Sequence, residues 1–108
     1  MEDCAVITLA GSTDGFQDGT GDEVQFNFPR GIAVDAEGTV FVADSYNHRI
    51  RRIDGTTGVV TTVAGSTAGF RDGNGLEAQF FNPRDVAVDA KGTIFVADQW
   101  NHRIRRID

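Results

Sequence analysis

A stretch of 26 residues occurs twice in this chain. Residues 29–54 read PRGIAVDAEGTVFVADSYNHRIRRID, and residues 83–108 read PRDVAVDAKGTIFVADQWNHRIRRID. The two copies are offset by 54 residues without a gap, and 34 of 54 positions are identical between the two halves of the chain. We therefore predict two repeats, 1–54 and 55–108. Units of this size are usually single supersecondary elements, and at least three are normally needed to bury their apolar faces.

Short apolar runs separated by glycine turns predict an all-β fold, and no helical period is present. In the first repeat, the runs at 31–35 and 40–43 are almost continuously apolar, which indicates burial on both faces. The next run, 49–54, is charged. A four-stranded sheet with this polarity gradient is typical of a β-propeller blade. A β-sandwich would explain the number of strands but not the 54-residue repeat. The predicted strands of one blade are Gly31–Asp35, Val40–Ala43, Arg49–Asp54 and Val59–Ala64.

The repeated motif also resembles a known family. Both copies follow the pattern P-x-G-I-A-V-D-x-x-G-x-V-[FY]-V-A-D-x-x-N-H-R-I of the NHL repeat, except that Asp85 replaces the usual glycine in the second copy. The resemblance implies a β-propeller, commonly with six blades. It leaves the function open, because NHL propellers include RNA-binding modules, protein-interaction domains, an amidating lyase and ligand-binding ectodomains.

The order of the strands predicts how chains assemble. Residues 5–10 match the outer strand 59–64, but the second blade ends at residue 108 without an outer strand of its own. An unpaired edge invites pairing with another chain, and head-to-tail contacts close into a ring or polymerise. Three chains give the six blades that the resemblance implies, so we predict a homotrimer, with a tetramer of eight blades as the alternative. MEDC, at residues 1–4, would take the place of GTTG at residues 55–58. The strand-exchange residues are Ala5, Val6, Ile7, Thr8, Leu9 and Ala10 of one chain, and Arg103, Ile104, Arg105, Arg106 and Ile107 of its neighbour.

Arginine and aspartate recur at the ends of the inner strands. Arg30 begins one strand and Asp44 ends the next, so antiparallel pairing favours an ion pair between them. Arg84 and Asp98 repeat this arrangement. We interpret both pairs as pinning the inner strands. A polar ring near the axis that holds an anion or water is the alternative.

An Asn-His-Arg turn also recurs, and it contains the only histidines of the chain. One histidine per blade, far from the axis, does not converge as tetrahedral zinc requires, and no nucleophile stands near for a hydrolytic triad. We expect hydrogen-bonded structural turns, with aromatic side chains that pack between blades or contact a partner. The predicted polar network or ligand face comprises Arg30, Arg84, Asp44, Asp98, Asn47, Asn101, His48, His102, Tyr46 and Trp100.

Ten of the 20 differences between the halves lie in or beside the two long loops of each repeat. This distribution fits loops that tolerate change better than diversified recognition. The acids at positions 14, 18, 22 and 23 lack the spacing of a calcium-binding EF-hand, and two are replaced in the second copy. The arginines at positions 49, 51, 52, 103, 105 and 106 predict a solvated basic rim, with an RNA-binding band as the alternative. Asp54, Asp108 and Glu2 would neutralise this rim in part.

Composition narrows the partners. A net charge of −6 disfavours nucleic acid, and the apolar part of MEDCAVITLAG is too short for a membrane span or signal peptide. We expect a soluble, cytoplasmic chain with one free thiol at Cys4 and no cofactor. The predicted function is a non-enzymatic, self-assembling scaffold, whether a natural fragment, a reconstruction or an engineered unit. A module that binds a protein or small ligand on the long-loop face is the alternative, and a metal-dependent lyase is a further one.

Overall fold

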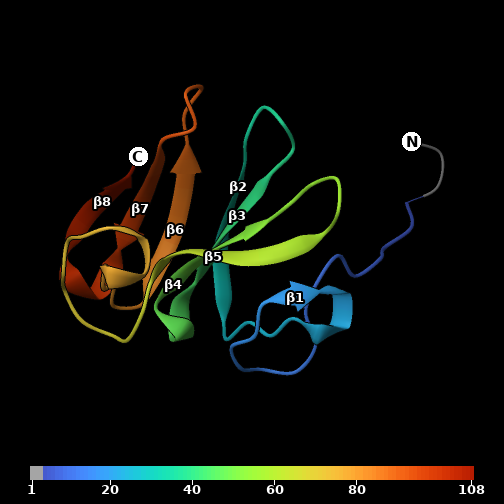
Figure 1. Cartoon of the computed structure of the whole chain (residues 1–108), viewed down its shortest axis with the longest axis horizontal. Coiled ribbons are helices and arrows are strands. Elements are labelled where there is room, and N and C mark those ends of the chain that lie inside the picture. Colours follow the sequence, from blue (N-terminus) through green and yellow to red (C-terminus); the bar gives the residue numbers. More distant parts are fainter. Residues whose placement is uncertain (1–3) are drawn as a thin grey trace.

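The computed structural model describes residues 4–108, which form two antiparallel β-sheets joined by one long loop, residues 66–82 (Figure 1). The first sheet has the strand order β1-β5-β4-β3-β2, and the second has the order β6-β7-β8. No helix in this part of the chain is long and apolar enough to cross a membrane. The strands are β1 (Gly19–Thr20), β2 (Pro29–Val34), β3 (Val40–Asp44), β4 (Arg49–Ile53), β5 (Val59–Gly65), β6 (Pro83–Val88), β7 (Ile94–Asp98) and β8 (Arg103–Ile107), and the short 3-10 helices are η1 (Gly21–Glu23), η2 (Ser45–Asn47), η3 (Gly75–Glu77) and η4 (Gln99–Asn101).

Aspartates fix the turns between the strands. Asp35 Oδ1 accepts hydrogen bonds from two backbone N–H groups of the turn before β3, at 2.9 and 3.0 Å, and Asp89 repeats this arrangement before β7. Asp54 does the same before β5, where the N–H groups of Thr57 and Thr56 lower the pKa of its carboxyl group. These hydrogen bonds stabilise the turns, so each strand ends where the sequence changes from apolar to polar residues. The four strands predicted for the first blade are present, and their ends differ from the prediction by at most two residues.

The predicted strand over residues 5–10 is not formed within the single chain. Residues 4–9 have no regular structure and are exposed, and Met1, Glu2 and Asp3 lie outside the described residues. A strand needs a neighbouring strand to pair with its backbone N–H and C=O groups. The outer edge of β5 is not available, because β1 pairs with it. The other free edge, β8, lies at the opposite end of a molecule that is 44 Å long (Figure 1).

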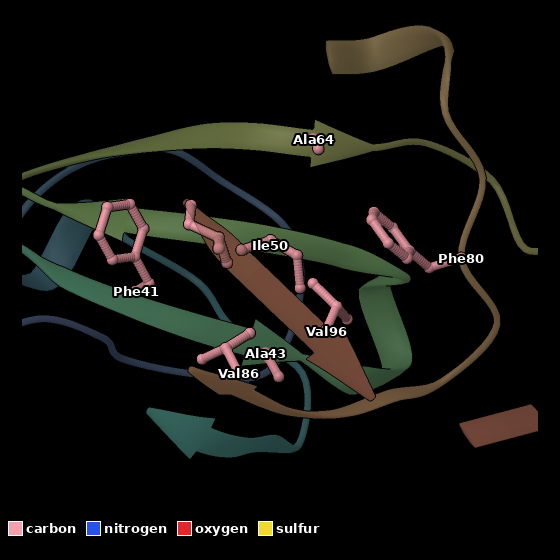
Figure 2. Close-up of a cluster of buried hydrophobic side chains, with 8 residues drawn as sticks. Phe41, Ala43, Ile50, Ala64, Phe80, Val86 and Val96 are labelled. Carbon is pink, nitrogen blue, oxygen red and sulfur yellow. The ribbon is translucent and has the colours of Figure 1, made fainter. Parts of the chain in front are cut away.

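The two sheets pack face to face through an apolar core (Figure 2). Phe41, Ala43 and Ile50 come from the first sheet, and Val86 and Val96 come from the second. Their burial removes apolar surface from water, which stabilises the folded state by roughly 25 cal/mol for each Å² buried. The interface therefore holds the two sheets together, while the pairing of β4 with β5 also joins the two repeats.

Hydrogen bonds beside this core set the register of the two repeats. The Ser45 hydroxyl donates to the Pro83 carbonyl, and the Asn82 N–H donates to His48 Nδ1 at 3.1 Å. The His48 ring also meets the Phe81 ring edge-on, at 5.5 Å between centroids. Burial, and then Arg49, lower the pKa of His48, whereas Asp98 and Asp44 act in the opposite direction. His48 is therefore held neutral as a hydrogen-bond acceptor.

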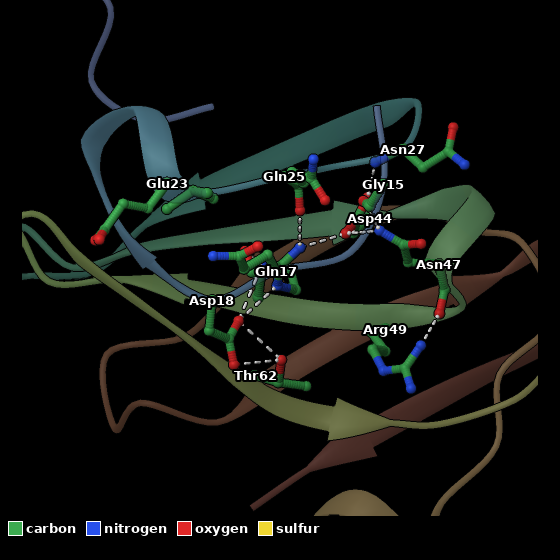
Figure 3. Close-up of polar contacts among 12 residues, drawn as sticks. Gly15, Gln17, Asp18, Glu23, Gln25, Asn27, Asp44, Asn47, Arg49 and Thr62 are labelled. Carbon is green, nitrogen blue, oxygen red and sulfur yellow. Dashed lines mark hydrogen bonds and ion pairs between the residues drawn. The ribbon is translucent and has the colours of Figure 1, made fainter. Parts of the chain in front are cut away.

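A buried arginine ties the long loop to the first sheet. Arg51, on β4, is fully buried and donates to Asp44 Oδ2 at 2.6 Å and to Asp18 Oδ1 at 2.9 Å. It also donates to the carbonyls of Gln25 and Gln17, each at 2.8 Å. Figure 3 shows these partners gathered from β3 and from the loop before β2. The predicted solvated rim is therefore wrong for Arg51 and for its counterpart Arg105, because both side chains are buried and donate to backbone carbonyls of the long loops.

Replacing this arginine should destabilise the fold strongly. Arg51→Met leaves the Asp44 carboxylate buried without its ion partner, which costs about 3–5 kcal/mol of the free energy of unfolding. Arg52→Met is the matched control, because Arg52 and Asp54 are partly exposed and 3.9 Å apart, and solvent screens such a pair, so its loss should change the stability little. Urea denaturation followed by circular dichroism measures both losses. Equal losses in the two variants would contradict the assigned role of Arg51.

The lowered pKa of His48 predicts a loss of stability in mild acid. In the unfolded chain, this histidine takes up a proton as the pH falls through its ordinary pKa near 6.5, whereas in the folded chain it does so only at lower pH. Protonation therefore stabilises the unfolded state relative to the folded state. The melting temperature should therefore fall between about pH 7.5 and about pH 5.5. His48→Asn should reduce this fall, because asparagine tolerates the left-handed backbone (φ 56°) and does not titrate here. An identical fall in wild type and His48→Asn would refute the assignment.

Candidate functional site

The most distinctive surface of the chain is an open groove beside β8. In the first sheet, β4 is covered by β5, and β5 in turn by β1. In the second sheet, β8 is the edge strand, and a groove of about 550 Å³ separates it from the loop before β6. The groove is lined by Phe70, Asp72, Gly73, Ala78, Phe80, Arg103, Ile104, Arg105 and Arg106. A shift of 54 residues maps these positions onto those around β5.

The walls of this groove are already built. Arg105 donates to Asp98 Oδ2 at 2.7 Å and to Asp72 Oδ1 at 2.8 Å, as Arg51 does to its own partners. Arg103 stacks on Phe70 at 4.0 Å, the distance that separates Arg49 from its phenylalanine in the first repeat. The loop therefore keeps its place although no strand lies against it. Burial, and then Arg51, lower the pKa of Arg49, which remains a cation at neutral pH.

The strand that fills the equivalent space in the first repeat shows what the groove accepts. Thr62 on β5 donates its hydroxyl to Asp18 Oδ1 at 3.1 Å, and Val60 pairs with Gly19. Asp18 is 40% exposed, whereas its counterpart Asp72 is 83% exposed. An extended segment with a small hydroxyl residue between apolar ones therefore suits the groove.

Each repeat also leaves one apolar face uncovered. Ile50 on β4 is fully buried between the sheets, but its counterpart Ile104 on β8 is 74% exposed. Val86 on β6 is 6% exposed, whereas its counterpart Ile32 on β2 is 63% exposed. Both halves of the internal interface thus occur a second time at the two ends of the molecule, without a partner.

The predicted ion pairs between Arg30 and Asp44 and between Arg84 and Asp98 are wrong. Asp44 is fully buried and instead binds the guanidinium group of Arg51, and Asp98 binds that of the equivalent arginine in the second repeat. The prediction failed because Arg30 and Arg84 are exposed and line an open hollow, whereas the carboxylates of Asp44 and Asp98 are buried. The loop positions that complete the buried networks, 17, 18 and 25 in the first repeat and 71, 72 and 79 in the second, were not among the predicted sites.

The asparagines of the repeated turn have structural partners. Asn47 Nδ2 donates to the Gly15 carbonyl at 2.7 Å and to Asp44 Oδ2 at 2.8 Å. Asn101 makes the same two contacts in the second repeat. Each turn is thereby fastened to the long loop and to the end of the preceding strand. Within residues 4–108, no three histidine, cysteine or acidic side chains gather to hold a metal ion.

An aromatic pair lies on the long-loop face of each repeat. Tyr46 packs against Phe28 at 4.4 Å between centroids, and Trp100 stacks on Phe81 at 5.2 Å. Phe28 has φ of 54°, in the left-handed region that bulky residues avoid, and it is exposed. Its counterpart Asn82 is a residue type that tolerates this conformation.

Comparisons with known proteins agree with this geometry. The NHL repeat model matches residues 26–53 and 80–107. The chloroplastic protein SUPPRESSOR OF QUENCHING 1 of Arabidopsis thaliana is 42% identical over 95 residues, which cover 87% of this chain and 9% of that protein. The probable peptidyl-alpha-hydroxyglycine alpha-amidating lyase pgal-1 of Caenorhabditis elegans is 35% identical over 85 residues, or 77% of this chain and 23% of that protein.

A solved structure shares the fold. A Bacteroides thetaiotaomicron protein of unknown function superposes with a TM-score of 0.84 at 35% identity, over 90% of this chain and 26% of that one. The chain thus spans less than a third of the length of each of these proteins. Two matched family repeats, each with its strands in antiparallel order, make this chain a member of the NHL-repeat family and of its β-propeller fold.

Proposed function

We propose that this chain is a non-enzymatic, self-assembling unit of a β-propeller, in which residues 5–10 of one copy fill the groove beside β8 of another. The observation that carries the proposal is a pattern of alternate identity. Val6, Thr8 and Ala10 are identical to the groove-filling residues at 60, 62 and 64, whereas positions 5, 7 and 9 differ from their counterparts. In β5, Val60 and Ala64 are buried and Thr62 bonds to Asp18, so the identical positions are those that make contacts in the filled groove.

The burial of the two segments fits this reading. Val60 is 1% exposed in β5, whereas Val6 is 95% exposed in the single chain. By the register of β4 with β5, Thr8 would pair with Arg105 of the other copy, and Val6 would pair with Ile107. The Thr8 hydroxyl would then reach Asp72, as Thr62 reaches Asp18.

The two uncovered faces supply the larger stabilisation. The face of Ile104 on one copy would pack on the face of Ile32 on the next, as Ile50 and Val86 pack inside the chain. A blade face of four short strands covers roughly 300 Å². Covering two such faces would contribute up to roughly 15 kcal/mol, as an upper bound. This is enough to offset the cost of association.

The contact is head-to-tail, so it closes a ring or grows into a filament. Three copies give six blades, the number common among NHL propellers. The junction between copies differs from the internal one near the axis, because a Cβ atom at Gly31 would lie 2.5 Å from Asp85 Cα. Between copies, Asp85 takes the place of that glycine, so the inner strands must stand farther apart there.

The absence of catalysis is part of the proposal. Its support is that the polar side chains of the repeated motif already bind one another, as Arg51, Asp44 and Asn47 do. Residues in such a closed network are not available to a substrate. The similarity to a lyase covers less than a quarter of that enzyme.

Light scattering tests the assembly directly. The chain should have a mass near three times 11.7 kDa, and Ile104→Asp should reduce it to that of one chain because a charge cannot be buried at the junction. Thr8→Pro should also weaken the ring, because proline removes an N–H group and restricts the strand. Leu76→Asp is the control, since Leu76 is exposed and the first repeat already has aspartate at the equivalent position. A monomeric wild-type chain, or a trimer unaffected by Ile104→Asp, would refute the proposal.

Recognition of a peptide on the long-loop face is the second candidate function. Its specific support is the exposed Phe28–Tyr46 pair, in which Phe28 adopts a costly backbone conformation. Peptides selected on this chain from a random library should lose at least about tenfold in affinity with Phe28→Asn, as expected for an aromatic hot spot. Retained affinity in Phe28→Asn would exclude this surface.

A further inference from the structure

Two arginines, on the neighbouring strands β2 and β6, make no ion pair within the described residues. Arg30 and Arg84 occupy the second positions of β2 and β6, which are neighbouring strands. Both are exposed, and neither side chain is within 4.0 Å of a carboxylate among residues 4–108. Both line one hollow of about 510 Å³, together with Gly31, Asp85 and Ala97. The hollow therefore collects positive charge in a chain whose net charge is −6.

The carboxylate in this hollow is already engaged. Asp85 Oδ1 accepts a hydrogen bond from the Val86 N–H at 2.9 Å, and the Asp85 side chain lies against Gly31. It offsets one of the two positive charges, so the hollow keeps a net charge of about +1. Other arginines of the same two sheets form ion pairs. Arg51 and Arg105, for example, each bind an aspartate. The two free guanidinium groups thus differ from most arginines of this chain.

We propose that the hollow between Arg30 and Arg84 binds a small oxyanion with several charged oxygens, of the phosphate or polycarboxylate class. Planar guanidinium groups donate paired hydrogen bonds that match such oxygens. An anion also relieves the repulsion between two neighbouring cations. Each single chain contains one such hollow, so binding of the anion does not require the chains to assemble.

The axial form of the site rests on the proposed function. In a ring of three copies, six arginines and three Asp85 carboxylates would surround the axis, because each chain contributes two and one. The spacing forced by Asp85 between copies would leave room there for a ligand. A ring should therefore bind the anion more tightly than a single chain does.

Isothermal titration with inorganic phosphate and with citrate, at constant ionic strength, tests the proposal. We expect binding by the wild-type chain, at least tenfold weaker binding by Arg84→Gln, and none by Arg30→Gln/Arg84→Gln. Arg71→Gln is the matched control. Arg71 is exposed and without an ion pair among residues 4–108, and the first repeat has glutamine at its position. Arg71→Gln should bind as wild type does.

Binding that survives in the double variant, or that falls equally in Arg71→Gln, would overturn the site. No binding of either anion by a folded wild-type chain would overturn it as well. Light scattering on the same samples measures assembly, so the test of the anion site can be judged separately from the test of the ring. Arginine-dependent binding by a single chain would support the site while the ring fails, and a ring without binding would refute the site while assembly stands.

Discussion

The buried guanidinium group of Arg51 is the interaction on which the first repeat depends. Its hydrogen bonds join β4 to the end of β3 and to the loop before β2, over sequence separations of 7 to 34 residues. A cation with no exposure is stable only where every such partner stays in place. The loop is therefore held rigidly although it has little regular structure. Arg105 holds the second loop in the same way, which is why the groove beside β8 exists without a strand to fill it.

This demand for partners decides which polar residues remain for function. Within residues 4–108, every buried side-chain nitrogen and oxygen has a hydrogen-bond partner. The aspartates, asparagines and central arginines of the repeated motif are used up by the fold. What remains are surfaces of another kind: an open strand edge, two uncovered apolar faces and the arginines of the inner strands. Each of these suits association or binding better than acid–base chemistry.

Much of the fold could be predicted from sequence because its causes are local. Apolar runs that end at aspartate and glycine mark the strands, and β2 to β5 lie where those runs lie. The partner of Asp44 could not be predicted in this way, since local reasoning pairs it with Arg30 at the adjacent strand end. The true partner, Arg51, lies on the charged strand that sequence alone assigns to the surface. Its burial depends on partners brought from the distant loop, the carbonyls of residues 17 and 25 and the carboxylate of Asp18, in addition to Asp44.

The segment at residues 5–10 shows a different limit. Its pattern identifies it as a strand, but no pattern within one chain states where its partner lies. In the single chain it is exposed, because β1 blocks one edge and distance excludes the other. In a ring, the tight contact of Gly31 with Asp85 would occur only inside each chain. The junctions between copies would be wider at the axis and therefore weaker, so a ring of this kind should come apart at its subunit boundaries before its blades unfold.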